Sequence, residues 1–187
     1  MIPTPTPAPR RASAGFMLAH PARWLALGFG SGLSPWAPGT VATLWAWLAF
    51  LLLDLWLDEL GWALLLLAGL LVGWWACTRT ARELGRADPT AIVWDEVLAF
   101  WVVLWLLMPA DLLAQVAAFV LFRLFDTVKW GPVRWADRAF KGQPGRAPSW
   151  PQGFGILLDD LVAALCTLLV IALAHWLWPL WGVLAGR

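Results

Sequence analysis

The stretch ILLDDLVAALCTLLVIALAHW, residues 156–176, decides the class of fold. Nearly all of its side chains are apolar, and an apolar run of this length is typical of a transmembrane helix. It nevertheless carries two adjacent carboxylates near its start, Asp159 and Asp160. Charges are costly in hydrocarbon, so this pair indicates a position near the membrane surface, a functional site, or both.

The composition of the whole chain agrees with a membrane protein. Its 187 residues are 61% hydrophobic and 13% charged, with a mean hydropathy of +0.70, whereas about a quarter of the residues in a soluble domain are charged. The net charge of +1 argues against a nucleic-acid partner, which requires a basic surface. The two cysteines, Cys77 and Cys166, lie in separate apolar runs and have no metal-ligand spacing.

The apolar segments predict an all-α fold, a polytopic membrane helical bundle with about four to five spanning helices. Residues 16–30 are predicted to form an additional N-terminal interfacial helix, with Arg23 facing the lipid headgroups. We expect residues 1–15 to be a disordered cytosolic tail and residues 16–187 to form a single membrane-embedded domain. The candidate spans are residues 41–57, 61–77, 92–108, 112–125 and 156–178.

The basic residues predict the orientation in the membrane. Every lysine and arginine except Arg187 lies before the first span, between the second and third, or around the connection from the fourth to the fifth. The positive-inside rule places these regions, and the N-terminus, in the cytoplasm. Five acidic residues lie inside or against the spans on this same side: Asp95, Glu96, Asp126, Asp159 and Asp160.

Local interactions could account for these acids one by one. A helix dipole stabilises acids near a helix start, which covers all of them except Asp126. Asp126 lies near a helix end, where it could pair with Arg123 or with Lys129 at a spacing of three residues. The gathering of acids at three helix ends nevertheless favours one shared site.

Carboxylates without histidine or cysteine partners suit a hard cation such as Mg²⁺, which prefers oxygen ligands and often bridges to phosphate. Arg123 and Lys129 are suited to binding a phosphate group. Adjacent residues on a helix point about 100° apart, so Asp159 and Asp160 are not expected to face one neighbour together. One of them could bind the metal while the other binds it through water or orients a basic residue.

A glycine-rich loop, FGSGLSPWAPGT at residues 29–40, precedes the first span. The backbone amides of Gly30, Gly32 and Gly39 could form a nest that binds an anion. The alternative is an irregular entry into the membrane with a Pro-Gly turn.

Four motifs, taken together, resemble the phosphatidylglycerophosphatase A family of bacterial inner-membrane lipid phosphatases. The motifs are FGSGLSPWAPGT at 29–40, DPTAIVWDE at 88–96, FRLFDTVKWGPVRWAD at 122–137 and GFGILLDDLVAAL at 153–165. They occur in the order of the family and cover residues 28 to 170 approximately.

The resemblance implies Mg²⁺-dependent hydrolysis of phosphatidylglycerophosphate to phosphatidylglycerol and phosphate, in phospholipid biosynthesis. It implies metal ligands among Asp95, Glu96, Asp159 and Asp160, and catalytic roles for Arg123, Asp126, Lys129 and Asp160. Pro38, Gly39 and Thr40, with Arg123 and Lys129, are then expected to bind substrate. Asp88 and Asp137 also fall on acidic positions of the family.

The implied location is the bacterial inner (cytoplasmic) membrane, with a multi-pass chain and a cytoplasmic active site. The implied partners are the bilayer and a phospholipid substrate. A transporter or ion-binding protein that uses the same acidic cluster remains the alternative.

The chain departs from the pattern of the family in three places. Trp130 stands where the family has proline, residues 143–152 are expected to be an outward-bulging insertion, and Ala42-Thr43 replaces a Gly-Ser pair. None of these changes removes an acid or Arg123.

Overall fold

The computed structural model describes residues 11–86, 89–140 and 148–184, with the side chains of the last helix described as far as Leu177. Within these ranges the chain is helical, as predicted, and contains no strand. The elements are α1 (Ala14–Leu18), α2 (Pro21–Ala26), the 3₁₀ segment η1 (Gly28–Leu33), α3 (Pro38–Leu53), α4 (Glu59–Leu84), α5 (Trp94–Leu107), α6 (Leu112–Val128), α7 (Pro132–Ala139) and α8 (Trp150–Leu184).

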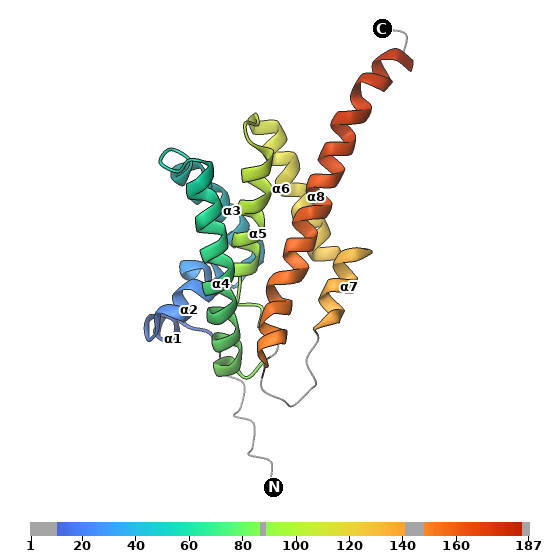
Figure 1. The fold of residues 1–187 in the computed structure, drawn as a ribbon. Coiled ribbons are helices and arrows are strands. Elements are labelled where there is room, and N and C mark those ends of the chain that lie inside the picture. Colours follow the sequence, from blue (N-terminus) through green and yellow to red (C-terminus); the bar gives the residue numbers. More distant parts are fainter. Residues whose placement is uncertain (1–10, 87–88, 141–147, 185–187) are drawn as a thin grey trace.

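Helix α5 lies at the centre of a bundle made with α3, α4, α6 and α8 (Figure 1). The buried residues of α5 run from Trp94 to Leu104 and lie on every side of the helix. This is expected of a helix that is apolar on all of its faces. The shorter helices α1, α2 and α7 lie at the end of the bundle where α5 and α8 begin (Figure 1). Among the described residues, the acids identified in the sequence lie toward that end, together with Arg123, Lys129, Arg134 and Arg138.

Tryptophan side chains of α5 connect it to its neighbours through backbone carbonyls. The indole N–H of Trp94 donates to the carbonyl of Gly69 on α4, and that of Trp101 donates to the carbonyl of Ala46 on α3, both at 2.9 Å. A Cβ atom at Gly73 would collide with the Trp94 indole ring. Small residues of this kind allow membrane helices to approach closely.

Gly73→Val is therefore expected to lower the apparent midpoint of thermal unfolding, because overpacking a close helix contact costs about 1–3 kcal/mol. The measurement is thermal unfolding of the detergent-solubilised protein. Ala68→Val, at an exposed position on the same helix, is the matched control and should leave the midpoint unchanged. Equal midpoints for the two variants would contradict the α4–α5 packing.

The N-terminal segment differs from the single interfacial helix predicted over residues 16–30. Pro21 begins a new helix, α2, with His20 as its N-cap, because proline cannot continue a preceding helix. Arg23 was expected to face the headgroups, and this expectation is wrong. Its Nε atom contacts Glu83 Oε2 on α4 at 2.7 Å, and its Nη1 donates to the carbonyl of Phe16 at 2.9 Å.

Among the described helices, α4 and α8 are long and apolar enough to cross a bilayer by length and composition, which is fewer than the four to five expected. Helices α3, α5 and α6 have 16, 14 and 17 residues, or about 21–26 Å at about 1.5 Å per residue. A typical hydrocarbon core is about 30 Å thick. Apolar residues in the turns extended two of the candidate spans, 41–57 and 92–108, beyond helices α3 and α5.

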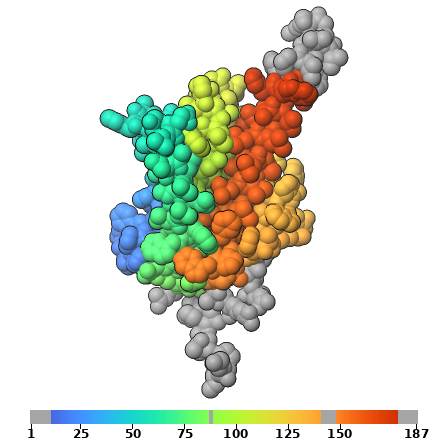
Figure 2. Space-filling view, viewed as in Figure 1, coloured from blue at the N-terminus to red at the C-terminus, as the bar shows by residue number. Residues whose placement is uncertain are grey.

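The outer surface of the bundle fits association with a membrane. Helices α4 and α8 cover much of the face seen in Figure 2, and their outward side chains are largely leucine. Exposed apolar residues include Leu44, Leu48, Leu64, Leu67, Leu71, Val120, Leu124, Leu165 and Leu169. Apolar surface on this scale marks contact with lipid or with another protein.

Parts of three predictions lie outside the described residues: positions 1–10 of the expected tail, Asp88, and residues 143–147 of the expected insertion. Helix α1 begins at Ala14, within the segment expected as tail. Residues 148–152, the part of the expected insertion that the structure describes, pack on α4 rather than bulging outward. The Arg82 side chain donates to the Pro148 carbonyl at 2.6 Å, and the Trp74 indole donates to the Trp150 carbonyl at 2.8 Å.

Candidate active site

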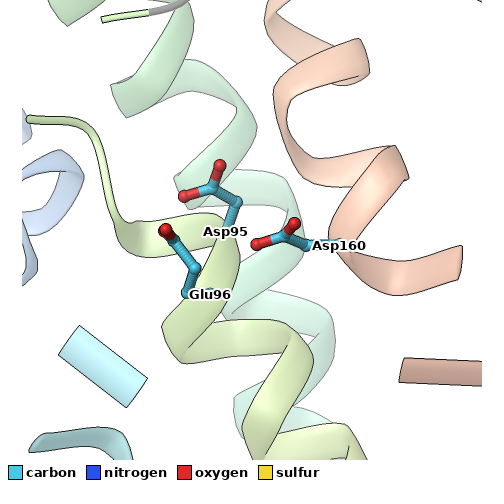
Figure 3. A group of neighbouring side chains, drawn as sticks. All are labelled: Asp95, Glu96 and Asp160. Atoms are coloured by element: carbon cyan, nitrogen blue, oxygen red, sulfur yellow. The ribbon is translucent and has the colours of Figure 1, made fainter. Parts of the chain in front are cut away.

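Three of the predicted acids meet in one cluster where α5 and α8 pack together. Asp95 and Glu96 lie in the first turn of α5, where the helix dipole favours negative charge. Asp160 projects from α8 toward them (Figure 3). One carboxylate oxygen from each of the three residues lies within 4.8 Å of the others. The two helices therefore assemble a site that neither one could form alone.

The cluster contains buried oxygen atoms that have no hydrogen-bond partner among the described residues: Asp95 Oδ1, Glu96 Oε2 and Asp160 Oδ2. Asp160 is only 3% exposed. Buried acids without donors are strongly unfavourable unless a cation compensates them. Three carboxylate oxygens this close together are ligands of the kind that a hard divalent cation prefers, so these residues fit Mg²⁺.

Arg123 lies at the edge of this cluster. Its Nη1 atom is 2.6 Å from Asp126 Oδ2, 3.8 Å from Glu96 Oε1 and 3.4 Å from Thr43 Oγ1. The spacing of the sequence predicted two possible partners for Asp126, and the structure shows the pair with Arg123. The Nε atom of Arg123 is buried and has no partner among the described residues, which leaves a donor for an anionic ligand.

Lys129 also lines the cavity and contacts two acids there. Its Nζ atom lies 2.9 Å from Asp137 Oδ1 on α7 and also contacts Asp159 Oδ2 on α8. Burial lowers the pKa of Lys129, but the Asp159 and Asp137 carboxylates outweigh burial and raise it above its ordinary value. The side chain is therefore an ammonium ion at physiological pH.

The backbone of Lys129 is in the left-handed conformation, with φ 51°, at the C-cap of α6. Glycine is usual there, and another residue costs on the order of 1–3 kcal/mol. A lysine at such a position is consistent with a need for its ammonium group between α7 and α8.

The two aspartates of α8 therefore have different partners. Asp160 joins Asp95 and Glu96, whereas Asp159 contacts Lys129. This is the division that the 100° between adjacent helix residues predicts. Asp159, which was expected among the metal ligands, does not belong to the three-carboxylate cluster, although it lines the same cavity.

The glycine-rich loop contributes to the site only at its end. Ala37, in a left-handed conformation with φ 42°, turns the chain into α3, which begins with Pro38 and Gly39. A Cβ at Gly39 would collide with Glu96 Oε1 and would lie 3.0 Å from both Nη atoms of Arg123. Glycine at this position therefore lets the start of α3 lie against the charged cluster.

The nest suggested for Gly30 and Gly32 does not form. Both amides donate to the carbonyl of Leu27, at 3.0 and 3.1 Å, so they are not available to an anion. Thr40 is half-buried but does not line the cavity, in contrast to Pro38 and Gly39.

The charged groups of the site line one cavity of about 370 Å³. Its charged lining residues are Asp95, Glu96, Arg123, Asp126, Lys129, Asp137, Asp159 and Asp160.

Sequence reasoning from charge alone missed two residues that contribute to the site. Asp137 was identified only by the family resemblance, and Thr43 was noted only as a departure from the pattern of the family. Thr43 donates to the Gly39 carbonyl at 2.8 Å and lies beside Arg123, and the spacing of four residues from Gly39 is the signal that could have identified it.

Comparison with known proteins assigns the chain to a family. The sequence profile described as Phosphatidylglycerophosphatase A matches residues 24–175. The chain is 36% identical to a protein named Phosphatidylglycerophosphatase A from Escherichia coli K12, over 93% of this chain and 94% of that protein. It is 35% identical to a protein of the same name from Haemophilus influenzae, over 86% and 93% of the two chains.

A third relative carries a different name. A Bacteroides thetaiotaomicron protein, named provisionally as a phosphatidylinositol-3-phosphatase, is 36% identical over 80% of this chain and 90% of its own length. No solved structure matches the chain. The profile match and the full-length relatives show that this chain belongs to the phosphatidylglycerophosphatase A family of lipid phosphatases.

Proposed function

We propose that this protein hydrolyses the phosphomonoester of phosphatidylglycerophosphate to phosphatidylglycerol and phosphate, with Mg²⁺, in phospholipid biosynthesis. The observation that carries the proposal is the cluster of Asp95, Glu96 and Asp160, whose buried oxygens lack partners among the described residues, beside Arg123 in a single cavity. Membership in a phosphatase family does not favour the transporter alternative.

In this proposal Asp95, Glu96 and Asp160 hold the metal, which supplies charge neutralisation and activation of a water molecule when bound. Arg123 donates hydrogen bonds to the phosphate oxygens, and Asp126 holds the guanidinium in position. The place of Asp126 beside the cluster also makes it the candidate base for the attacking water. Gly39 lets the start of α3 lie against Glu96 and Arg123.

Lys129 supplies a second positive charge in the cavity of the proposed site. Its contacts with Asp137 and Asp159 fix the ammonium group at the wall of the cavity. A fixed cation there attracts a phosphate dianion and costs no reorganisation during the reaction. In this arrangement Asp159 positions Lys129 rather than binding the metal directly.

We further propose a multi-pass arrangement in the bacterial inner membrane, with this end of the bundle and the N-terminus in the cytoplasm. The gathering of basic residues at the cavity end supports this orientation. Helices α3, α5 and α6 would then cross with local thinning of the bilayer, with the acyl chains of the substrate in the bilayer and its phosphate at the cavity.

The direct test is phosphate release from short-chain phosphatidylglycerophosphate by the purified protein in a non-ionic detergent. We expect release with Mg²⁺, no release with excess EDTA, and recovery when Mg²⁺ is restored. The Escherichia coli relative, assayed in parallel, is the positive control. Phosphatidylinositol 3-phosphate, suggested by the name of the Bacteroides relative, serves as the comparison substrate. Absence of Mg²⁺-dependent release, while the control is active, would overturn the proposal.

A further inference from the structure

A second cavity, of about 440 Å³, adjoins the catalytic one at the end of α6. It lies against the start and outer side of α7, and its lining includes Trp130, Arg134 and Arg138. The two cavities share Lys129 and Asp137. The ion pair between these residues therefore forms a common wall between the catalytic cavity and its neighbour.

The second cavity is lined by two arginine side chains. Arg134 and Arg138 lie one turn apart on α7, opposite the buried residues Val133 and Ala136. Within the described part of the chain, neither arginine takes part in an ion pair or a side-chain hydrogen bond. By contrast, Arg23 and Arg123 each contact an acid. Two guanidinium groups on one helix face, each with five N–H donors, are suited to bind an anionic oxygen group.

The surroundings of this cavity indicate that its ligand is part of a lipid. The exposed residues Val120, Leu124 and Val128 form an apolar strip along α6 that ends at the cavity. Trp130 and Trp135, 59% and 68% exposed, lie at the same end. Exposed tryptophan beside arginine is typical of the headgroup level of a membrane. Acyl chains lying along the α6 strip would bring a headgroup to Arg134 and Arg138.

We propose that this cavity is the subsite for the phosphodiester of the substrate, with Arg134 and Arg138 as its ligands. The inference rests on the proposed function. A lipid of this kind carries two phosphates joined by a short polyol: a terminal monoester, which is cleaved, and a diester, which remains with the acyl chains. The catalytic cavity takes the monoester, and the adjoining cavity takes the diester. The protein thereby selects lipids that have both groups.

The chain offers a matched control for this pair of arginines. A cavity of about 310 Å³ on the other side of the catalytic one is also lined by two arginines, Arg11 and Arg86. It shares Pro38 and Thr90 with the catalytic cavity. Changing Arg11 and Arg86 removes the same charge from the same end of the molecule without touching α7.

The experiment compares wild type, Arg134→Gln/Arg138→Gln and Arg11→Gln/Arg86→Gln in a non-ionic detergent, where the substrate is the only anionic lipid. With short-chain phosphatidylglycerophosphate, the α7 variant should show a KM raised by roughly tenfold or more, as expected when two charge-assisted hydrogen bonds are lost. Its kcat should stay within about twofold, because the metal cluster and Arg123 are intact. The Arg11/Arg86 variant should resemble wild type in both constants.

A second substrate that lacks the phosphodiester tests the subsite independently. Short-chain phosphatidate has a phosphomonoester and no phosphodiester, so the α7 variant and wild type should hydrolyse it with the same kcat/KM, however low. Equal losses on the two substrates would overturn the subsite, as would an unchanged KM for phosphatidylglycerophosphate or a loss confined to the Arg11/Arg86 variant. Thermal unfolding midpoints equal to that of wild type establish that the variants are folded.

Added phosphatidylglycerol distinguishes the phosphodiester of the substrate itself from that of a neighbouring lipid. If the KM effect is seen only when phosphatidylglycerol is added to the micelles, the arginines bind neighbouring lipids and the subsite is wrong. If wild type does not hydrolyse phosphatidylglycerophosphate with Mg²⁺, the proposed function fails. If wild type is active and the α7 variant keeps its KM, the subsite alone fails.

Discussion

Asp160→Asn is expected to reduce Mg²⁺-dependent phosphate release by about a thousandfold, because a metal-assisted step is worth several kcal/mol and each 1.36 kcal/mol is a factor of ten in rate. Asparagine has nearly the same volume as aspartate but lacks the negative charge with which a carboxylate binds a divalent cation. Asp160 is buried and points at Asp95 and Glu96 (Figure 3). The loss of rate should appear in kcat, measured as phosphate release at saturating substrate.

The stability of this variant distinguishes a metal ligand from a structural aspartate. In EDTA, Asp160→Asn should unfold at no lower temperature than wild type, because it removes a buried charge beside other acids. With Mg²⁺, wild type should gain stability and the variant should not, since binding stabilises only the state that binds. Asp111→Asn is the control, because Asp111 caps α6 through Ala114 N at 2.8 Å and asparagine caps equally well. Near-normal turnover by Asp160→Asn would remove this residue from the site.

Arg123→Gln is expected to reduce kcat/KM by about a hundredfold to a thousandfold, the range for loss of one preorganised donor to a developing charge. Arg123 lies between Asp126 and Glu96, so the substitution removes the phosphate ligand and leaves two acids without their cation. Arg123→Lys keeps the charge but loses the planar fork, and we expect it to recover part of the activity. Phosphate release across a range of substrate concentrations measures both variants.

The control for Arg123 is Arg79→Gln. Arg79 is 42% exposed and pairs with Glu83 on the surface of α4 at 3.1 Å, and exposed pairs of this kind contribute about 0–1 kcal/mol. This variant should keep wild-type kinetics. If Arg123→Gln were folded and as active as Arg79→Gln, the phosphate would have to bind elsewhere in the cavity.

The acids of the site could be predicted from the sequence because a hydrocarbon-facing helix rarely tolerates charge. Asp95, Glu96, Asp126, Asp159 and Asp160 were identified in this way, and all of them line one cavity. Which member of the Asp159–Asp160 pair faces Asp95 could not be predicted. That choice depends on the rotation of α8 about its axis, which its packing against α5 and α7 determines.

Other features depended on local backbone geometry that residue types do not specify. The amides of Gly30 and Gly32 were expected to bind an anion, yet the chain turns back so that both donate to Leu27. Arg23 was expected to face the headgroups because it lies in an apolar stretch. Its partner, Glu83, is 60 residues away, and no local pattern reveals such a contact. The expected limits of the helices were inaccurate in both directions. The candidate span 41–57 runs past the end of α3 because the turn is apolar, whereas α8 begins six residues before the candidate span 156–178.

The central claim is that Asp95, Glu96 and Asp160 form one divalent-cation site, and metal binding tests it most directly. Mn²⁺, which accepts the same oxygen ligands as Mg²⁺, can be titrated into the detergent-solubilised protein and its free concentration followed by electron paramagnetic resonance. We expect wild type and Asp159→Asn to bind Mn²⁺ in competition with Mg²⁺, and Asp160→Asn to lose this binding. Binding of Mn²⁺ by Asp160→Asn as tightly as by wild type would contradict the claim.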